Sequence, residues 1–177
     1  MIPILETERL ILRGHMASDH DTLLAMRSDP EVYRHIAGFP ASAEESWRKL
    51  LATAGHWTIM GYGYWLVEEK DSGELVGEAG FSDFYRDIQP SLDGTLEAGW
   101  ALASAHHGKG YASEAVRATL SWAQKVHENM PITCIIGAEN VPSIALAEKL
   151  GFVERCRTIY KDGETPLYDW AGFPERV

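Results

Sequence analysis

The segment LEAGWALASAHHGKGYASEA, Leu96 to Ala115, decides the expected fold, because it joins a strand to a helix through a glycine turn. Gly108 and Gly110 let the backbone of that turn come close to a ligand and adopt unusual torsion angles. The first amides of the helix that follows have no partner inside the helix, and the helix dipole adds partial positive charge there. The segment therefore predicts an anion site, with phosphate or pyrophosphate as the natural ligand.

Two familiar phosphate loops do not fit this segment. The P-loop pattern requires Ser or Thr after its lysine, whereas Gly110 and Tyr111 follow Lys109. The dinucleotide fingerprint requires a third glycine where Ser113 stands, and an early strand-helix-strand unit. The loop is therefore expected to bind phosphate in another way, or to serve only as a tight turn.

The adjacent histidines His106 and His107 raise three alternatives, which are a metal site, a catalytic base and a simple flank of the loop. Neighbouring residues of one loop rarely converge on one ion, and no H-x-x-x-H motif or cysteine pair accompanies them. We therefore predict no metal. A base remains open, because histidine titrates near neutral pH.

The composition favours one soluble domain spanning residues 1–177, with a net charge of −10. That charge argues against nucleic-acid binding, which needs a basic surface, and mildly favours cationic substrates. The two cysteines, Cys134 and Cys156, form no motif, so a reducing cytoplasm is expected.

A membrane span and a signal peptide are not expected. Leu50 to Val67 holds no Asp, Glu, Lys or Arg, but its three glycines favour a helix end, a loop and a strand. The first ten residues, MIPILETERL, lack the basic start of a signal peptide.

The remaining elements follow from periodicity, capping residues and turns. The segment ETERLILRG predicts one first strand with Leu10 and Leu12 on one face. Helices are expected from a Ser18 or Asp19 cap to about residue 28, from the Ser42–Glu45 capping box to Gly55, over 111–127, and from an Asn140 cap to Gly151. Further strands are expected on both sides of Asp71-Ser72-Gly73, over TLEAGWALA and PITCIIGA, and near 152–160 and 165–171. This order predicts a mixed sheet with helices packed on it.

Four segments, in order, resemble the GNAT N-acetyltransferases, and more narrowly the branch that acetylates N-termini of ribosomal proteins. They are the opening strand ETERLILRG, LVGEAGF, LEAGWALASAHHGKGYASEA and NVPSIALAEKLGF. The resemblance implies the α+β GNAT fold, a mixed, mostly antiparallel sheet of about seven strands with about four helices packed on it. It also implies transfer of acetyl from acetyl-CoA to a primary amine, which is either a protein N-terminal α-amine or a small-molecule amine.

The resemblance implies a role for each part of the site. The Ala105–Ser113 loop would hold the pyrophosphate, the backbone of Trp100–Leu102 would pair with the pantetheine arm, and two residues of the last motif would lie beside the thioester. The implied cofactor-binding residues are Trp100, Ala101, Leu102, His107, Gly108, Lys109, Gly110, Tyr111, Ala112, Ser113, Asn140 and Ser143.

Two positions depart from the family pattern. Ala105 stands where relatives often have Gln or Arg, which weakens one expected pyrophosphate contact. Ala147 replaces a frequent tyrosine acid, so the resemblance offers Ser143 as the group that protonates or orients the leaving thiolate. Tyr160 and Tyr168 remain alternative acids.

The chemistry needs a neutral amine and therefore a base. A lysine amine of pKa about 10.4 is roughly one-thousandth neutral near pH 7.4, whereas an α-amine of pKa about 7.7–8.0 needs much less help. Glu97, on the strand that enters the glycine loop, is the candidate base, acting directly or through water, and Glu78 is the second candidate. The alternative is that Glu97 is an ordinary exposed carboxylate on a strand and has no catalytic role.

Two other functions remain open from the sequence. A non-catalytic acyl-CoA-binding module would keep the glycine loop without a competent base. A nucleotide-binding protein would use the same loop for another phosphate. The acceptor is not encoded in any readable motif, and the chain is expected to be a monomer or a homodimer.

Overall fold

The computed structural model describes residues 1–36, 38–161 and 163–174, which form two compact units. The first unit comprises Met1–Gly80 and Trp100–Trp122, and the second comprises Phe81–Gly99 and Ala123–Val177. The strands are β1 (Leu5–Glu6), β2 (Leu10–Arg13), β3 (Tyr64–Glu69), β4 (Leu75–Ser82), β5 (Leu96–Leu102), β6 (Ile132–Ile135), β7 (Phe152–Tyr160) and β8 (Gly163–Trp170). The helices are α1 (His20–Arg27), α2 (Pro30–Tyr33), α3 (Ala43–Met60), α4 (Tyr111–Val126) and α5 (Val141–Lys149), with short 3-10 turns at Ala17–Asp19 and Ser104–His106.

The strands follow the order β1-β2-β3-β4-β5-β6-β8-β7. The pairings β1 with β2, β2 with β3, β3 with β4, β6 with β8, and β7 with β8 are antiparallel. The pairing of β5 with β6 is parallel and joins Leu96 to Ile132 and Glu97 to Thr133. The expected mixed, mostly antiparallel α+β sheet is confirmed, with one strand and one helix more than predicted among the described residues.

The extra strand comes from ETERLILRG, which forms a hairpin rather than one strand. Leu5 lies opposite Leu12, and the Thr7 hydroxyl accepts a hydrogen bond from the Leu10 amide at 2.9 Å. This side-chain bond closes the turn between β1 and β2. The predicted alternation within β2 is confirmed, because Leu10 and Leu12 are fully buried.

The long helix α3 begins where the sequence predicted and ends later. The Ser42 hydroxyl accepts from the Glu45 amide while the Glu45 carboxylate accepts from the Ser42 amide, which completes the capping box. The predicted end at Gly55 is wrong, since the helix continues to a left-handed Gly61 with φ of 76°. Burial of Trp57 on the same helix outweighs the roughly 1 kcal/mol that an interior glycine costs.

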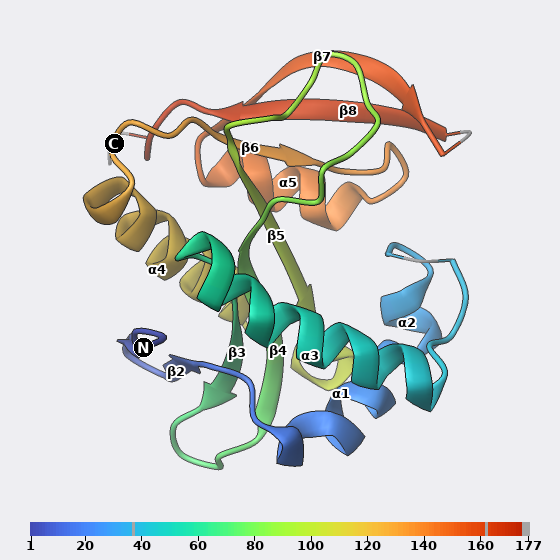
Figure 1. Ribbon diagram of the computed structural model, residues 1–177, viewed down its shortest axis with the longest axis vertical. Helices are drawn as coiled ribbons and strands as arrows, with labels where there is room; N and C mark the ends of the chain where they lie inside the picture. The colour runs from blue at the N-terminus through green and yellow to red at the C-terminus, as the bar shows by residue number, and fades with distance from the viewer. Residues whose placement is uncertain (37, 162, 175–177) are drawn as a thin grey trace. The chain divides into compact units, whose positions relative to one another are not determined.

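Three tryptophans form the aromatic core of the first unit. Trp57 of α3, Trp65 of β3 and Trp122 of α4 meet edge to face, with ring centroids 4.6 to 5.6 Å apart. Figure 1 shows α3 running across β3 and β4, and the Trp57–Trp65 contact shows that α3 packs on β3. The indoles of Trp57 and Trp65 also donate a hydrogen bond each to a backbone carbonyl, Trp57 to Tyr64 and Trp65 to Pro3.

Candidate active site

The glycine loop adopts the backbone that the sequence predicted. Gly108 and Gly110 are both left-handed, with φ of 74° and 82°, a region that disfavours side chains. A Cβ on Gly108 would meet no protein atom within 4 Å, so the loop is open on that side. The Glu114 amide bonds back to the Gly110 carbonyl at 3.2 Å and marks where the helical hydrogen bonds of α4 begin. An exposed loop with amides at a helix start fits a pyrophosphate group.

Arg9, in the turn between β1 and β2, holds this loop. Its guanidinium donates to the Lys109 carbonyl at 3.0 Å and to the Glu114 carboxylate at 2.8 Å, and it lies 4.5 Å from the centre of the Tyr111 ring. The Thr7 hydroxyl donates to the same Glu114 carboxylate at 2.6 Å. Arg9 thus brings a partly exposed cation to the glycine loop.

The two histidines have different surroundings. His106 is buried and packs against the Tyr111 ring, with its Nε2 3.7 Å from a Glu74 carboxylate oxygen. His107 is exposed, and its Nε2 lies 2.9 Å from the Leu102 carbonyl oxygen. Within residues 1–36, 38–161 and 163–174, no group of three or more His, Cys, Asp or Glu side chains is arranged to hold a metal ion.

A pocket of about 200 Å³ lies in the first unit. Glu78 of β4 and Ala101 of β5 both line it, and helices α1, α2 and α3 supply most of the other side chains. Ala101 belongs to the backbone segment that the family resemblance assigns to the pantetheine arm. The lining residues are Met26, Arg27, Val32, Tyr33, Ile36, Phe39, Ala41, Glu45, Ser46, Lys49, Glu78 and Ala101.

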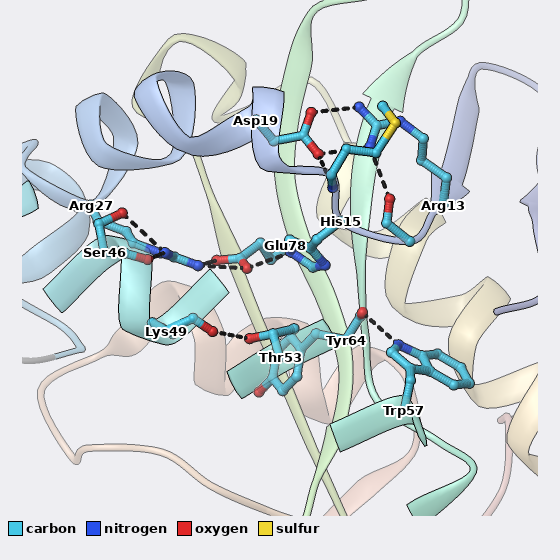
Figure 2. A network of polar contacts seen from close by, with 12 residues as sticks. Arg13, His15, Asp19, Arg27, Ser46, Lys49, Thr53, Trp57, Tyr64 and Glu78 are labelled. Carbon is cyan, nitrogen blue, oxygen red and sulfur yellow. Dashed lines mark hydrogen bonds and ion pairs between the residues drawn. The ribbon is translucent and has the colours of Figure 1, made fainter. Parts of the chain in front are cut away.

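Glu78 is the centre of a buried polar network in this pocket, shown in Figure 2. Its Oε1 accepts from His15 Nε2 at 2.8 Å and from Arg27 Nη2 at 2.8 Å, and its Oε2 accepts from the same Nη2 at 3.0 Å. Arg27 also donates from Nη1 to the Ser46 carbonyl and hydroxyl at 3.1 and 3.2 Å. All four side chains are buried, so the network has a fixed geometry.

The surroundings of Glu78 keep it ionised. Burial alone would raise its pKa, but the hydrogen bond from His15 and the charges of Arg27 and Lys49 outweigh burial and lower the pKa to about 2. A carboxylate offers about four acceptor positions, and three contacts are described here. One acceptor position of Oε2 therefore has no partner among the contacts described.

Lys49 is one turn of α3 beyond Ser46 and lines the same pocket. Loss of water around its ammonium lowers the pKa of Lys49, Glu78 opposes this effect, and Arg27 adds to it. The residue as a whole remains exposed.

Glu97 belongs to the second unit and is buried, not exposed as an ordinary strand carboxylate would be. Arg86 binds both of its oxygens, with Nε at 2.8 Å from Oε2 and Nη2 at 2.8 Å from Oε1. Arg86 Nη1 also donates to the Tyr160 hydroxyl at 3.0 Å. Glu97 lines a cavity of about 10 Å³, which is room for one water molecule at most.

The last motif also lies in the second unit, where Asn140 caps α5. Its Oδ1 accepts from the Ser143 amide at 3.3 Å, so the cap is the asparagine and not the Ser143 hydroxyl. Ala147 is fully buried, and Gly151 takes the left-handed position after the helix, as predicted. Tyr168 is buried in β8, where burial raises the pKa of its hydroxyl.

The structure thus places the glycine loop, Trp100–Leu102 and Glu78 in the first unit, and Glu97, Asn140 and Ser143 in the second. The sequence did not predict that Arg27 and Lys49 belong to the site. One signal was available for Arg27, because it continues the buried stripe of Leu23 and Met26 on α1, and a charge on an apolar stripe needs a partner.

The model of the acetyltransferase (GNAT) domain family matches residues 9–153, and the chain belongs to this family. It is a GNAT N-acetyltransferase, as the fold and glycine loop indicated. An uncharacterized N-acetyltransferase of Bacillus licheniformis, p20, is 30% identical over 149 residues, covering 84% of this chain and 81% of that protein.

Solved structures agree with this assignment. A GnaT-family acetyltransferase from Bordetella pertussis superposes with a TM-score of 0.85 at 31% identity, covering 96% of this chain and 99% of that one. RimL, a ribosomal alpha-N-protein acetyltransferase solved in complex with coenzyme A, shares the fold with a TM-score of 0.76 at 17% identity, covering 94% and 97% of the two chains. Use of acetyl-CoA follows from the family.

None of the helices in the described residues combines the length and the apolar character needed to cross a membrane. The uncharged stretch Leu50–Val67 is divided between α3 and β3, as the glycines within it predicted.

Proposed function

We propose that this enzyme transfers acetyl from acetyl-CoA to the primary amine of a small acceptor held in the 200 Å³ pocket. The observation that carries the proposal is that one pocket is lined both by the carboxylate Glu78 and by Ala101, the middle residue of the segment assigned to pantetheine. An amine in this pocket would lie beside the strand along which the thioester is expected.

The reaction needs no covalent enzyme intermediate. The amine nitrogen bonds to the thioester carbonyl carbon, the carbon–sulfur bond breaks, the nitrogen gives up one proton, and the sulfur leaves as a thiolate that takes up one proton. Acetyl-CoA supplies the activated acetyl group. The α-amine at the end of a peptide chain, of pKa about 7.7–8.0, reaches its neutral form at neutral pH far more readily than a lysine amine.

Different residues of the chain bind the cosubstrate and the amine. The loop amides and Lys109 hold the pyrophosphate, and the Trp100–Leu102 backbone pairs with the pantetheine arm. Glu78 accepts a hydrogen bond from the amine through its remaining Oε2 position. With a pKa of about 2 it does not retain a proton at neutral pH.

Glu97 remains the proposed base and acts through a water molecule, for which the cavity beside it has room. Ser143 is the proposed acid or orienting group for the thiolate, with Asn140 beside it. Asn140 caps α5 through its own side chain.

Thiol release from acetyl-CoA in the presence of a panel of amines tests the proposal. Binding of acetyl-CoA is first confirmed by calorimetry, with ATP and NAD as competitors. We expect turnover with at least one primary amine. Tight acetyl-CoA binding without turnover on any amine would point to a binding module, and displacement by ATP or NAD would point to a nucleotide-binding protein.

A further inference from the structure

The pocket has an apolar side that the chemistry of acetyl transfer does not require. Val32 and Tyr33 line it, together with Ile36 and Phe39, which are 51% and 59% exposed. Exposed apolar side chains around a pocket favour a ligand with an apolar group of its own. The volume, about 200 Å³, is below the roughly 300–1,000 Å³ usual for drug-sized ligands. The group that enters is therefore small.

The pocket lining also includes two hydrogen-bond donors for which no acceptor is described, Arg27 Nε and the Lys49 ammonium. Arg27 is 6% exposed, yet its Nε has no hydrogen-bond partner, although its other two nitrogens are engaged by Ser46 and Glu78. Across the described ranges, no carboxylate lies within bonding distance of the Lys49 ammonium. A buried donor that the protein leaves unsatisfied is unfavourable unless a ligand or water completes it.

The charges around the pocket include both signs and cancel. Arg27 and Lys49 are positive, and Glu45 and Glu78 are negative. Glu78 is held by Arg27, and Glu45 Oε2 accepts from the Ser42 amide and hydroxyl, which turns part of that carboxylate toward the helix cap. A net cation such as a polyamine would leave the two free donors unmatched. A zwitterion would match both signs.

We propose that the acceptor is a free α-amino acid with an apolar side chain, bound as a zwitterion. Its carboxylate accepts from Arg27 Nε and the Lys49 ammonium, its side chain lies against Val32, Tyr33 and Phe39, and its amine lies toward Glu78 and Ala101. This inference rests on the proposed function and names its substrate class. A zwitterion also carries no net charge, so the protein's charge of −10 does not repel it.

A matched panel of substrates tests whether the enzyme recognises the carboxylate of the acceptor. Thiol release is measured with the full chain and L-leucine, L-valine, L-methionine or L-phenylalanine, each beside its amide and its decarboxylated amine, and with leucyl-glycyl-glycine and spermidine. We expect at least one amino acid to exceed its own amide in kcat/KM by about tenfold or more, the effect of one charge-assisted hydrogen bond. Equal or better turnover of the amides, the tripeptide or spermidine overturns the inference and leaves the proposed function intact. If acetyl-CoA binds and no amine is turned over, both the inferred acceptor and the proposed function are contradicted.

The variant Lys49→Met tests the site itself. It keeps the length of the side chain and removes the ammonium, so KM for the amino acid should rise about tenfold, and by more than KM for its amide. Lys125→Met, an exposed lysine on α4 that does not line the pocket, is the control and should change neither value. Equal effects of Lys49→Met on the acid and the amide would contradict carboxylate binding.

Discussion

Arg9 donates a hydrogen bond from its guanidinium to the backbone carbonyl of Lys109 at 3.0 Å, across 100 positions of the sequence. The same side chain pairs with Glu114 in the first turn of α4, so one residue of the β1–β2 turn fixes both the glycine loop and the helix start. The expected pyrophosphate site therefore depends on the first ten residues of the chain as well as on the loop itself.

Replacing Arg9 by methionine should weaken acetyl-CoA binding. The loop loses its anchor and the site loses a cation, so we expect the Kd to rise roughly three- to tenfold, with a weaker dependence on salt. Isothermal calorimetry at two salt concentrations measures both effects. Arg48→Met, at an exposed arginine of α3 outside the pocket, should leave the Kd unchanged. An unaltered Kd in Arg9→Met would mean that the loop holds its shape without this contact.

The buried carboxylate Glu78 should make the free energy of unfolding fall as the pH is lowered into the acid range. Its pKa in the folded protein is about 2, below the ordinary 4.5, so its ionised form stabilises the fold above about pH 4.5. That contribution, roughly 3 kcal/mol from the size of the shift, should be lost as the pH falls from 4.5 toward 2. Urea unfolding between pH 7 and 3 measures it.

The variant Glu78→Gln provides the comparison. At pH 7 it leaves Arg27 buried without its counter-charge and should cost about 3–5 kcal/mol. The difference from the unmodified protein should shrink as the pH falls below 4.5. Glu154→Gln, at an exposed ion pair with Arg157, should show little change at any pH. A constant difference across the pH range would show that the charge of Glu78 is not what stabilises the network.

The proposed base is tested by Glu97→Gln. We expect turnover to fall by about a hundredfold, within the usual range for loss of a general base, while acetyl-CoA affinity survives. Arg86→Met distinguishes a catalytic role of Glu97 from a structural role of the ion pair. It keeps the Glu97 carboxylate and removes the arginine that binds it. Normal rates for Glu97→Gln over a full pH profile would exclude Glu97 as the base. Equal losses in both variants would assign the pair a purely structural role.

Ser143→Ala should slow turnover without unfolding the protein, because the hydrogen bond that caps α5 belongs to Asn140. Asn140→Ala should instead lower the free energy of unfolding by about 1 kcal/mol, the usual value of such a cap. Urea unfolding and thiol release on both variants distinguish the two roles. If Ser143→Ala keeps the full rate, the acid has to be sought elsewhere, with Tyr160 and Tyr168 as candidates.

Much of the fold was predictable because local chemistry dictates it. The capping box at Ser42, the left-handed Gly108 and Gly110, and the asparagine cap of α5 all appear as expected. The family signatures predicted the mixed, mostly antiparallel sheet and the place of the glycine loop. These features depend on neighbours within a few residues, or on a pattern shared by many chains.

Other features were not predicted because contacts between residues distant in the sequence determine them. Ser18 or Asp19 was expected to cap α1. Asp19 occupies the N-cap position, but its side chain makes no cap hydrogen bond, because the carboxylate binds Arg13 and the Met16 amide. The pairing of Arg27 with Glu78 joins positions 51 residues apart, and no spacing in the sequence encodes it. The pocket follows from such contacts, so its donors became visible only in the folded structure.

The tryptophans have a practical consequence for measurement. Five of the six tryptophans lie in the first unit, where three of them pack together, and Trp170 belongs to the second. Intrinsic fluorescence therefore reports almost entirely on the first unit, whereas far-ultraviolet circular dichroism reports on both. Coincident unfolding curves from the two signals would mark a single cooperative transition, and separated curves would reveal that the two units melt independently.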